Sequence, residues 1–144
     1  MLESLTFDRI DTMTVPMEPD QDHQVVERAE NLALELGFGR DQIDEIKLAL
    51  IEAVINAIEH GRSAERMVHI SFALSRKPLC MAIAIGDSGS GFNPVTVQNP
   101  DIREKIGKKV RKRGWGLKIM RSLMDEVKIE TSDTGTRITL VKRG

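Results

Sequence analysis

Residues 79–91 read LCMAIAIGDSGSG, an apolar run that leads directly into a glycine-rich loop. The run 79–85 shows no alternation of apolar and polar side chains, which is typical of a central strand buried on both faces. Residues 67–75 do alternate and predict a half-exposed strand. Lys77-Pro78 predicts the turn between the two strands. Because strands joined by so short a turn pair antiparallel, this part of the chain predicts the middle of an antiparallel sheet.

The rest of the chain predicts further strands and helices around this pair. Apolar spacing and turn residues indicate an edge strand at 3–15, helices at about 22–36, 41–60 and 117–124, and strands at 126–131 and 136–142. Asp20 or Asp22 and Asp41 are expected to cap the first two helices, and Gly37 and Gly61 to end them. We therefore expect an α/β two-layer sandwich, with a mixed, mostly antiparallel sheet and helices packed on one face.

Composition limits the class of protein. The chain has 144 residues, 40% hydrophobic and 30% charged, which suits a single soluble domain over 1–144. A net charge of -1 argues against a protein that binds nucleic acid over its whole surface. The longest apolar run is too short to span a bilayer, and the N-terminus shows no signal-peptide pattern. Cys80 has no partner for an internal disulfide, so we expect a cytoplasmic protein.

The helix predicted over Ile43–His60 is apolar on almost every side, and Glu52 and Asn56 interrupt it. A spacing of four puts both side chains on one helix face, about 6 Å apart along the axis. A partly buried carboxylate and amide need partners, which a divalent cation with phosphate oxygens supplies. The Asn56 carbonyl oxygen suits Mg²⁺, and Glu52 can take a proton from an attacking hydroxyl or water. The pair is also compatible with the polar edge of a surface helix.

Asp87, Gly89 and Gly91 follow the buried strand. An aspartate at a strand end can accept a hydrogen bond from the exocyclic amine that marks adenine, and glycines let the backbone approach a flat base or ribose. No helix is predicted directly after this loop, which excludes a dinucleotide fingerprint, and the chain has no Walker motif. A tight turn at the strand exit is the alternative interpretation.

Gly114-Trp115-Gly116 precedes the helix predicted at 117–124. N–H groups at a helix start, with the positive end of the helix dipole, bind phosphate. The segment 101–113 carries seven Lys or Arg against two acidic residues. It fits a lid over a triphosphate, but also a solvated charged loop or a contact to the phosphate backbone of nucleic acid. Scarce aromatic side chains for stacking weaken the last interpretation.

Two further residues are candidates for the same site. His60 lies on the same helix face as Glu52, although a histidine at a helix end more commonly bonds the terminal carbonyls. Thr136 begins the last strand, where its hydroxyl can reach a base or its water, or can simply complete a turn. The three histidines show no metal-ligand spacing with Cys80, so no zinc-type site is predicted.

These segments resemble the GHKL, or Bergerat-fold, ATP-binding superfamily of histidine kinases, type II topoisomerases and mismatch-repair ATPases. Residues 52–61 (EAVINAIEHG) resemble its N-box, and residues 87–92 (DSGSGF) and 113–117 (RGWGL) resemble its two glycine boxes. Gly135-Thr136 matches the threonine that closes the adenine site. The compact length and the stretch 116–127 (GLKIMRSLMDEV) are similar to those of bacterial anti-sigma-factor serine kinases.

The resemblance implies a Bergerat ATP-binding fold with ATP and Mg²⁺ as cofactors. Asn56 would hold Mg²⁺, Asp87 would read adenine, and Glu52 would be the catalytic base acting on a serine hydroxyl of a partner protein. The other residues that would shape the loops or contact the nucleotide are His60, Gly89, Gly91, Lys112, Arg113, Gly114, Gly116, Leu117 and Thr136, with Lys112 or Arg113 meeting the γ-phosphate.

The resemblance also implies a function. The chain would be an ATP-dependent serine protein kinase and anti-sigma factor that phosphorylates an anti-sigma-factor antagonist in a bacterial partner-switching pathway. It would bind the antagonist and a sigma factor, form a homodimer, and make no direct contact with nucleic acid or membrane. The alternative is a kinase-inactive protein of the same fold that changes partners as its lid orders on ATP.

Overall fold

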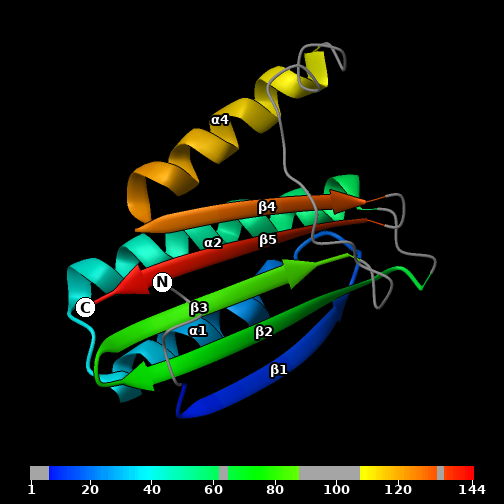
Figure 1. Ribbon diagram of the computed structural model, residues 1–144. Coiled ribbons are helices and arrows are strands. Elements are labelled where there is room, and N and C mark those ends of the chain that lie inside the picture. Colours follow the sequence, from blue (N-terminus) through cyan, green and yellow to red (C-terminus); the bar gives the residue numbers. More distant parts are fainter. Residues whose placement is uncertain (1–6, 62–64, 88–107, 133–134) are drawn as a thin grey trace.

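A computed structural model describes residues 7–61, 65–87, 108–132 and 135–144. Its elements are β1 (Arg9–Pro16), α1 (Asp22–Leu36), α2 (Arg40–His60), β2 (Met67–Arg76), β3 (Leu79–Gly86), α4 (Lys108–Leu123), β4 (Glu126–Ser132) and β5 (Gly135–Arg143). The strands form one sheet in the order β1-β2-β3-β5-β4, with every pairing antiparallel. Helices α1 and α2 cover one face of the sheet, and α4 lies beside α2 along the β4 edge (Figure 1). The predicted two-layer sandwich is confirmed, with a sheet that is antiparallel throughout.

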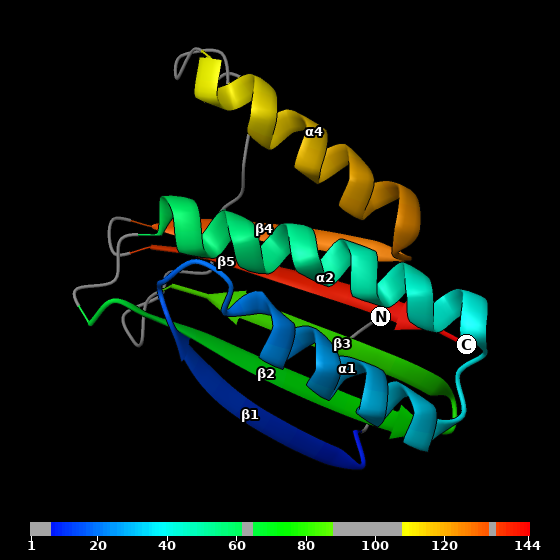
Figure 2. The same cartoon turned by 180° about the vertical axis from the view of Figure 1, so that it is seen from behind.

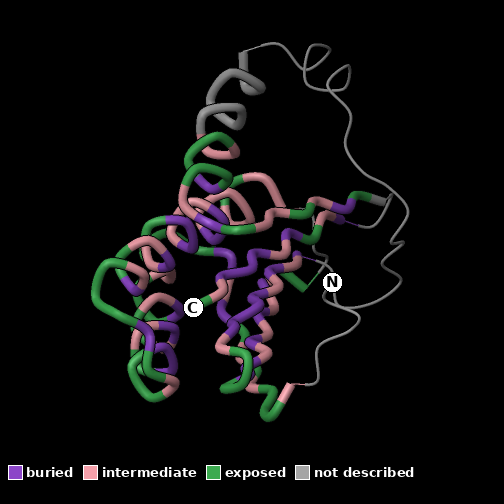
Figure 3. Tube along the Cα trace, turned by 60° about the vertical axis from the view of Figure 1, so that its left-hand side comes forward, coloured by how far each residue is buried: buried purple, intermediate pink, exposed green. Residues whose placement is uncertain are grey.

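The core lies between the helices and the sheet, as the facing buried segments in Figure 3 show. Alternate residues of β2, from Val68 to Leu74, are buried, and β3 is buried along most of its length. On α2, buried residues recur every three or four positions from Ile43 to Val54. The strand and helix periods of the sequence thus determine which side chains fill the core.

Helix α2 carries the motif residues and is the longest helix in the described ranges, with 21 residues. It starts at Arg40, and its N-cap is Gly39 rather than the predicted Asp41. The Gly39 N–H donates to Gln42 Oε1 at 3.2 Å, so a glutamine side chain satisfies the helix start. Gly61 ends the helix as predicted, donating its N–H to Ala57 O at 2.9 Å. Helix α1 likewise starts without the predicted aspartate cap.

The start of α4 differs most from the sequence-based prediction. A helix was expected only after Gly116, but α4 begins at Lys108 and contains both Gly114 and Gly116. Lysine and arginine, which dominate its first turns, are good helix formers, and a helix tolerates a glycine at about 1 kcal/mol relative to alanine. Only the first four N–H groups of a helix lack an intrahelical acceptor. The predicted helix start at these glycines is therefore wrong in this structure, and their role toward phosphate stays a prediction.

The C-terminal half of α4 agrees with the prediction. Leu117, Met120, Leu123 and Met124 pack in or against the core. Seen from behind in Figure 2, α4 runs alongside α2, against which it makes most of its contacts, and it also touches β4. No helix in the described part of the chain combines the length and the apolar character needed to cross a membrane.

Candidate nucleotide site

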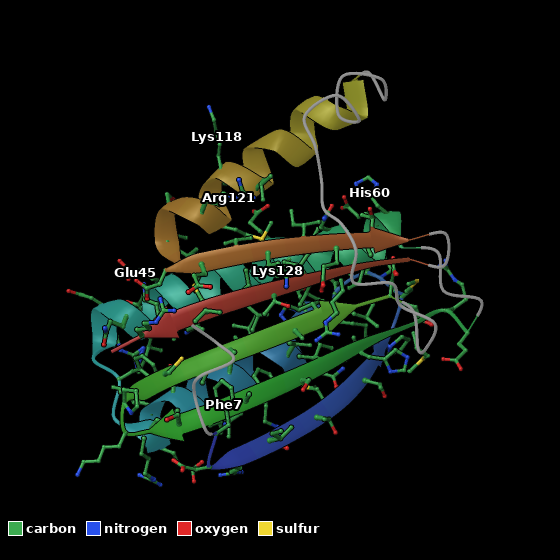
Figure 4. The ribbon with its side chains drawn as sticks, viewed as in Figure 1. Phe7, Glu45, His60, Lys118, Arg121 and Lys128 are labelled. Carbon is green, nitrogen blue, oxygen red and sulfur yellow. The ribbon has the colours of Figure 1, made fainter. Side chains whose placement is uncertain are left out.

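A hollow at one end of the sandwich brings together four of the predicted site residues. It lies between the C-terminal part of α2 and the neighbouring ends of β3 and β5, and it encloses about 300 Å³, part of it open to solvent. Figure 4 labels His60 at this end of α2. The residues that line the hollow are Asn56, Ala57, His60, Ile85, Asp87, Thr136 and Ile138.

The floor of the hollow is built by two paired strand ends. Ile85 on β3 lies opposite Ile138 on β5, which gives an apolar surface. The pairing continues past the strand end, where Asp87 N donates to Thr136 O at 3.2 Å and Thr136 N donates to Asp87 Oδ1 at 2.8 Å. Asp87 is only 3% exposed. A buried carboxylate held by a backbone N–H is a fixed hydrogen-bond acceptor.

Gly61 lies where the C-terminal end of α2 packs against Asp87. Its prediction as a helix end did not include this close packing. A Cβ at this position would lie 2.4 Å from Ala57 O, 2.4 Å from Met17 Cε and 2.9 Å from Asp87 Cβ. Only glycine therefore lets the end of α2 approach Asp87 so closely. Ile85 and Ile138 were also not predicted as site residues. Each lies two residues from a predicted one, and the period of a strand puts such pairs on the same face.

Glu52 lies one helical turn before Asn56, outside the set that lines the hollow. Its neighbour is Gly116 on α4, where a Cβ would lie 3.0 Å from Glu52 Oε1. Helix α4 therefore lies against one side of the Glu52 carboxylate. Among the described residues, the side chains of Glu52 and Asn56 make no hydrogen bond or ion pair.

Apart from the four that line the hollow, the predicted residues that the structure describes are not among its lining residues. Leu117 packs against the core, and Gly114 lies inside α4. Lys112 and Arg113 belong to α4, but their side chains, like Gly89 and Gly91, lie outside the described residues. His60 Nε2 is 3.8 Å from Glu59 Oε1 at the rim. The roles of all these residues toward a nucleotide stay predictions.

The described residues contain no cluster of three His, Cys, Asp or Glu side chains that could hold a metal ion. The assignment of Asn56 as a Mg²⁺ ligand stays a prediction.

An antiparallel sheet covered by helices on one face, with a hollow between a helix and two strand ends, is the arrangement expected of the ATP-binding fold predicted from the sequence. A profile of the histidine kinase-like ATPase domain matches residues 15–142. The chain belongs to the histidine kinase-like ATPase family.

Two groups of relatives within this family are similar to the chain. The chain is 26% identical over 133 residues to the serine-protein kinase RsbW of Bacillus licheniformis, covering 90% of this chain and 82% of that protein. It is 36% identical over 106 residues to the anti-sigma F factor of Bacillus thuringiensis strain Al Hakam, covering 71% of this chain and 70% of that protein. The predicted resemblance to anti-sigma-factor kinases is thereby confirmed.

A solved structure shares the fold. The structure of the RsbU and RsbW domains of Rv1364c from Mycobacterium tuberculosis superimposes with a TM-score of 0.68 at 21% sequence identity. The match covers 94% of this chain and 32% of that longer chain. This likeness concerns the fold.

Proposed function

We propose that this chain is an ATP-dependent serine protein kinase and anti-sigma factor whose substrate is an anti-sigma-factor antagonist. The observation that carries the proposal is the meeting of Asn56 and Asp87 in one hollow. Asp87 can accept a hydrogen bond from the adenine ring, and the Asn56 side-chain oxygen is a hard ligand suited to Mg²⁺. Both groups then lie in the same site. In phosphoryl transfer, positioning of the reactants and neutralisation of charge supply most of the rate enhancement. Asn56 and Asp87 are suited to these two tasks.

The chain's residues would divide the work as follows. Asp87, fixed by the Thr136 N–H, accepts from the exocyclic amine of adenine, and Ile85 and Ile138 pack against the ring. Asn56 holds Mg²⁺, which when bound neutralises charge on the phosphates. Glu52, one turn along α2, takes the proton from the attacking serine hydroxyl of the partner protein. Lys112 or Arg113 meets the γ-phosphate.

The names of the relatives support the choice of partners. Some are serine-protein kinases and others anti-sigma factors, so we propose that this chain binds both a sigma factor and its antagonist. We further propose that residues 1–144 form a single ATP-binding domain that works as a cytoplasmic homodimer, without direct contact to nucleic acid or membrane.

The nucleotide site is tested by calorimetry with Mg-ATP on wild type and Asp87→Asn. The asparagine still accepts the Thr136 N–H but presents an NH₂ group to the ring, so we expect at least about a tenfold loss of affinity, or about 1.4 kcal/mol. Asp125→Asn is a matched control, because Asp125 Oδ2 also accepts a strand N–H, from Arg143 at 2.6 Å. No heat with wild type, or equal affinity for both variants, would contradict the site.

The catalytic role is tested with radiolabelled ATP and an anti-sigma-factor antagonist as substrate. Glu52→Gln should abolish labelling of the antagonist while ATP affinity stays within about threefold, since a lost general base costs about 10²–10⁴ in rate. Normal labelling by this variant would show that Glu52 is not the base.

The contact between Gly116 and Glu52 favours a second candidate, an ATP-gated binding switch without kinase activity. Because α4 covers one side of the carboxylate, the helix could hold Glu52 away from a substrate hydroxyl. In that case the wild-type chain binds Mg-ATP and changes its affinity for a sigma factor, but never labels an antagonist.

A further inference from the structure

Lys142 is a buried lysine that the nucleotide site does not use. It lies on β5 and is 7% exposed. Its Nζ donates to Glu45 Oε1 on α2 at 2.6 Å and to the Leu123 carbonyl oxygen at 2.5 Å. Leu123 is the last residue of α4, so this carbonyl has no partner within its own helix. One ammonium group therefore ties together α2, the end of α4 and the sheet. Figure 4 shows Glu45 on α2 beside this end of α4.

The Lys142 tether and the contact between Gly116 and Glu52 form two connections, or rungs, between α2 and α4. Glu45 and Glu52 are seven positions apart on α2, and Gly116 and Leu123 are seven positions apart on α4. Seven residues make nearly two full turns, so each pair lies on one helix face, about 10 Å apart. The helices run antiparallel, because the later residue of α2 meets the earlier residue of α4.

The positions between the rungs are closely packed. Ala49 of α2 and Met120 of α4 lie midway between the rungs and belong to the same buried core cluster, at 0% and 3% exposed. Because helices resist bending over two turns and packed cores resist deformation, a shift of α4 at Leu123 carries to Gly116.

We propose that Lys142 is a positioning residue for the phosphotransfer reaction: by fixing α4 to α2 it holds Gly116 against Glu52 and sets the orientation of the catalytic base. The inference rests on the proposed function, because it concerns the base of that reaction. The partner of Lys142, Glu45, lies about two helical turns from Glu52 along α2. Lys142 is also not among the residues that line the hollow, so it should affect the chemical step and leave nucleotide binding unchanged.

Because the Lys142 ammonium is nearly buried, removing one of its partners costs more than breaking a surface ion pair. An exposed pair adds little to stability because water screens it, but a nearly buried ammonium must keep its partners. The pair Lys47–Glu30 provides the contrast. It joins α2 to α1 at 3.0 Å, with side chains 30% and 27% exposed, and it lies on the side of α2 away from α4.

The test compares Lys142→Met with Lys47→Met. Methionine keeps the length and apolar stem of lysine, and the remaining Glu45 carboxylate is 42% exposed and can be hydrated. Without nucleotide, we expect amide hydrogen exchange in residues 117–123 to rise at least about tenfold in Lys142→Met and to stay unchanged in Lys47→Met. At saturating Mg-ATP and a temperature at which both variants are folded, kcat for the antagonist should fall about tenfold in Lys142→Met only. The KM for ATP should stay within about threefold.

Glu45→Gln is the conservative variant. It keeps an acceptor opposite Lys142 and should retain most of the wild-type kcat. If Lys142→Met does not fold, Glu45→Ala takes its place, with the same expected exchange and kcat.

Unchanged kcat in the folded tether variant, whatever its exchange rate, would overturn the proposal, as would an equal fall of kcat in Lys47→Met. Failure of the proposed function itself looks different. The wild type would then label no antagonist, while the exchange experiment would still report whether Lys142 holds α4.

Discussion

Replacement of Gly61 by alanine tests whether the end of α2 must touch Asp87. The backbone angles of Gly61, φ −70° and ψ 160°, are open to alanine, so the effect of the substitution is purely steric. The added Cβ would lie 2.4 Å from Ala57 O and 2.9 Å from Asp87 Cβ. The Met17 methyl group can swing away, but the carbonyl cannot move without losing its hydrogen bond to the Gly61 N–H.

We expect Gly61→Ala to destabilise the protein by about 2–4 kcal/mol, from overpacking of about 1–3 kcal/mol and a weakened helix-end hydrogen bond of about 1 kcal/mol. For a chain of this size that corresponds to a fall in Tm of roughly 5–15 °C. Because Asp87 must also shift, the affinity for Mg-ATP should fall about tenfold, or about 1.4 kcal/mol. Circular dichroism melting and calorimetry measure the two effects.

Gly39→Ala is the control, since a Cβ there meets only Gln42 Oε1, at 3.9 Å. Its φ of −77° is also open to alanine, and its Tm should stay within about 2 °C of wild type, because the lost N-cap preference and the reduced unfolded-state entropy nearly cancel. A Gly61→Ala protein with the Tm and the ATP affinity of the control would refute the close approach of α2 to Asp87.

Three further predictions concern α4, the surface of the helix layer and the sheet. Gly116→Ala should stabilise α4 by about 1 kcal/mol, so Tm should rise. Because the added Cβ would lie 3.0 Å from Glu52 Oε1, the rate of phosphoryl transfer to the antagonist should fall about tenfold. A rise in both Tm and the transfer rate would contradict this prediction. A hydrogen bond from Lys47, with the nearby charges of Lys47 and Arg40, holds the pKa of Glu30 below its usual 4.5. Its stabilisation is therefore present above pH 4.5 and lost as the pH falls through the lower folded-state pKa; in urea unfolding, Glu30→Gln should lower the midpoint at pH 7 and have no effect near pH 2. Burial raises the pKa of the Cys80 thiol, so a thiol reagent at neutral pH should label native protein about 100-fold more slowly than protein in 6 M urea; equal rates would mean that the thiol is exposed.

The sequence predicted the layers and the central strands because these depend on periodicity. The alternation of 67–75 and the continuous apolar run of 79–85 became β2 and β3, and Gly37 and Gly61 end their helices where expected. The pair Glu52 and Asn56 could be assigned to one helix face, since a spacing of four fixes that in any helix. The signals that succeeded are local in the chain.

The start of α4 could not be read from the sequence, because the local signals conflicted. Two glycines favour a loop, whereas the preceding lysines and arginines favour a helix. The tether of Lys142 shows the other limit. A lysine near the end of a strand carries no sign that Glu45 and Leu123, 97 and 19 positions away, will surround it.

The sequence by itself determined the period of each element, the order of the strands along the chain and the chemical groups on the face of α2 that carries Glu52 and Asn56. Only the tertiary structure decided that Asn56 and Asp87 line one hollow, that Gly61 allows their approach and that α4 is held against Glu52. The reason is physical: hydrophobic periodicity is written in neighbouring residues, whereas a site depends on distances between side chains that only the packing of the helices on the sheet determines.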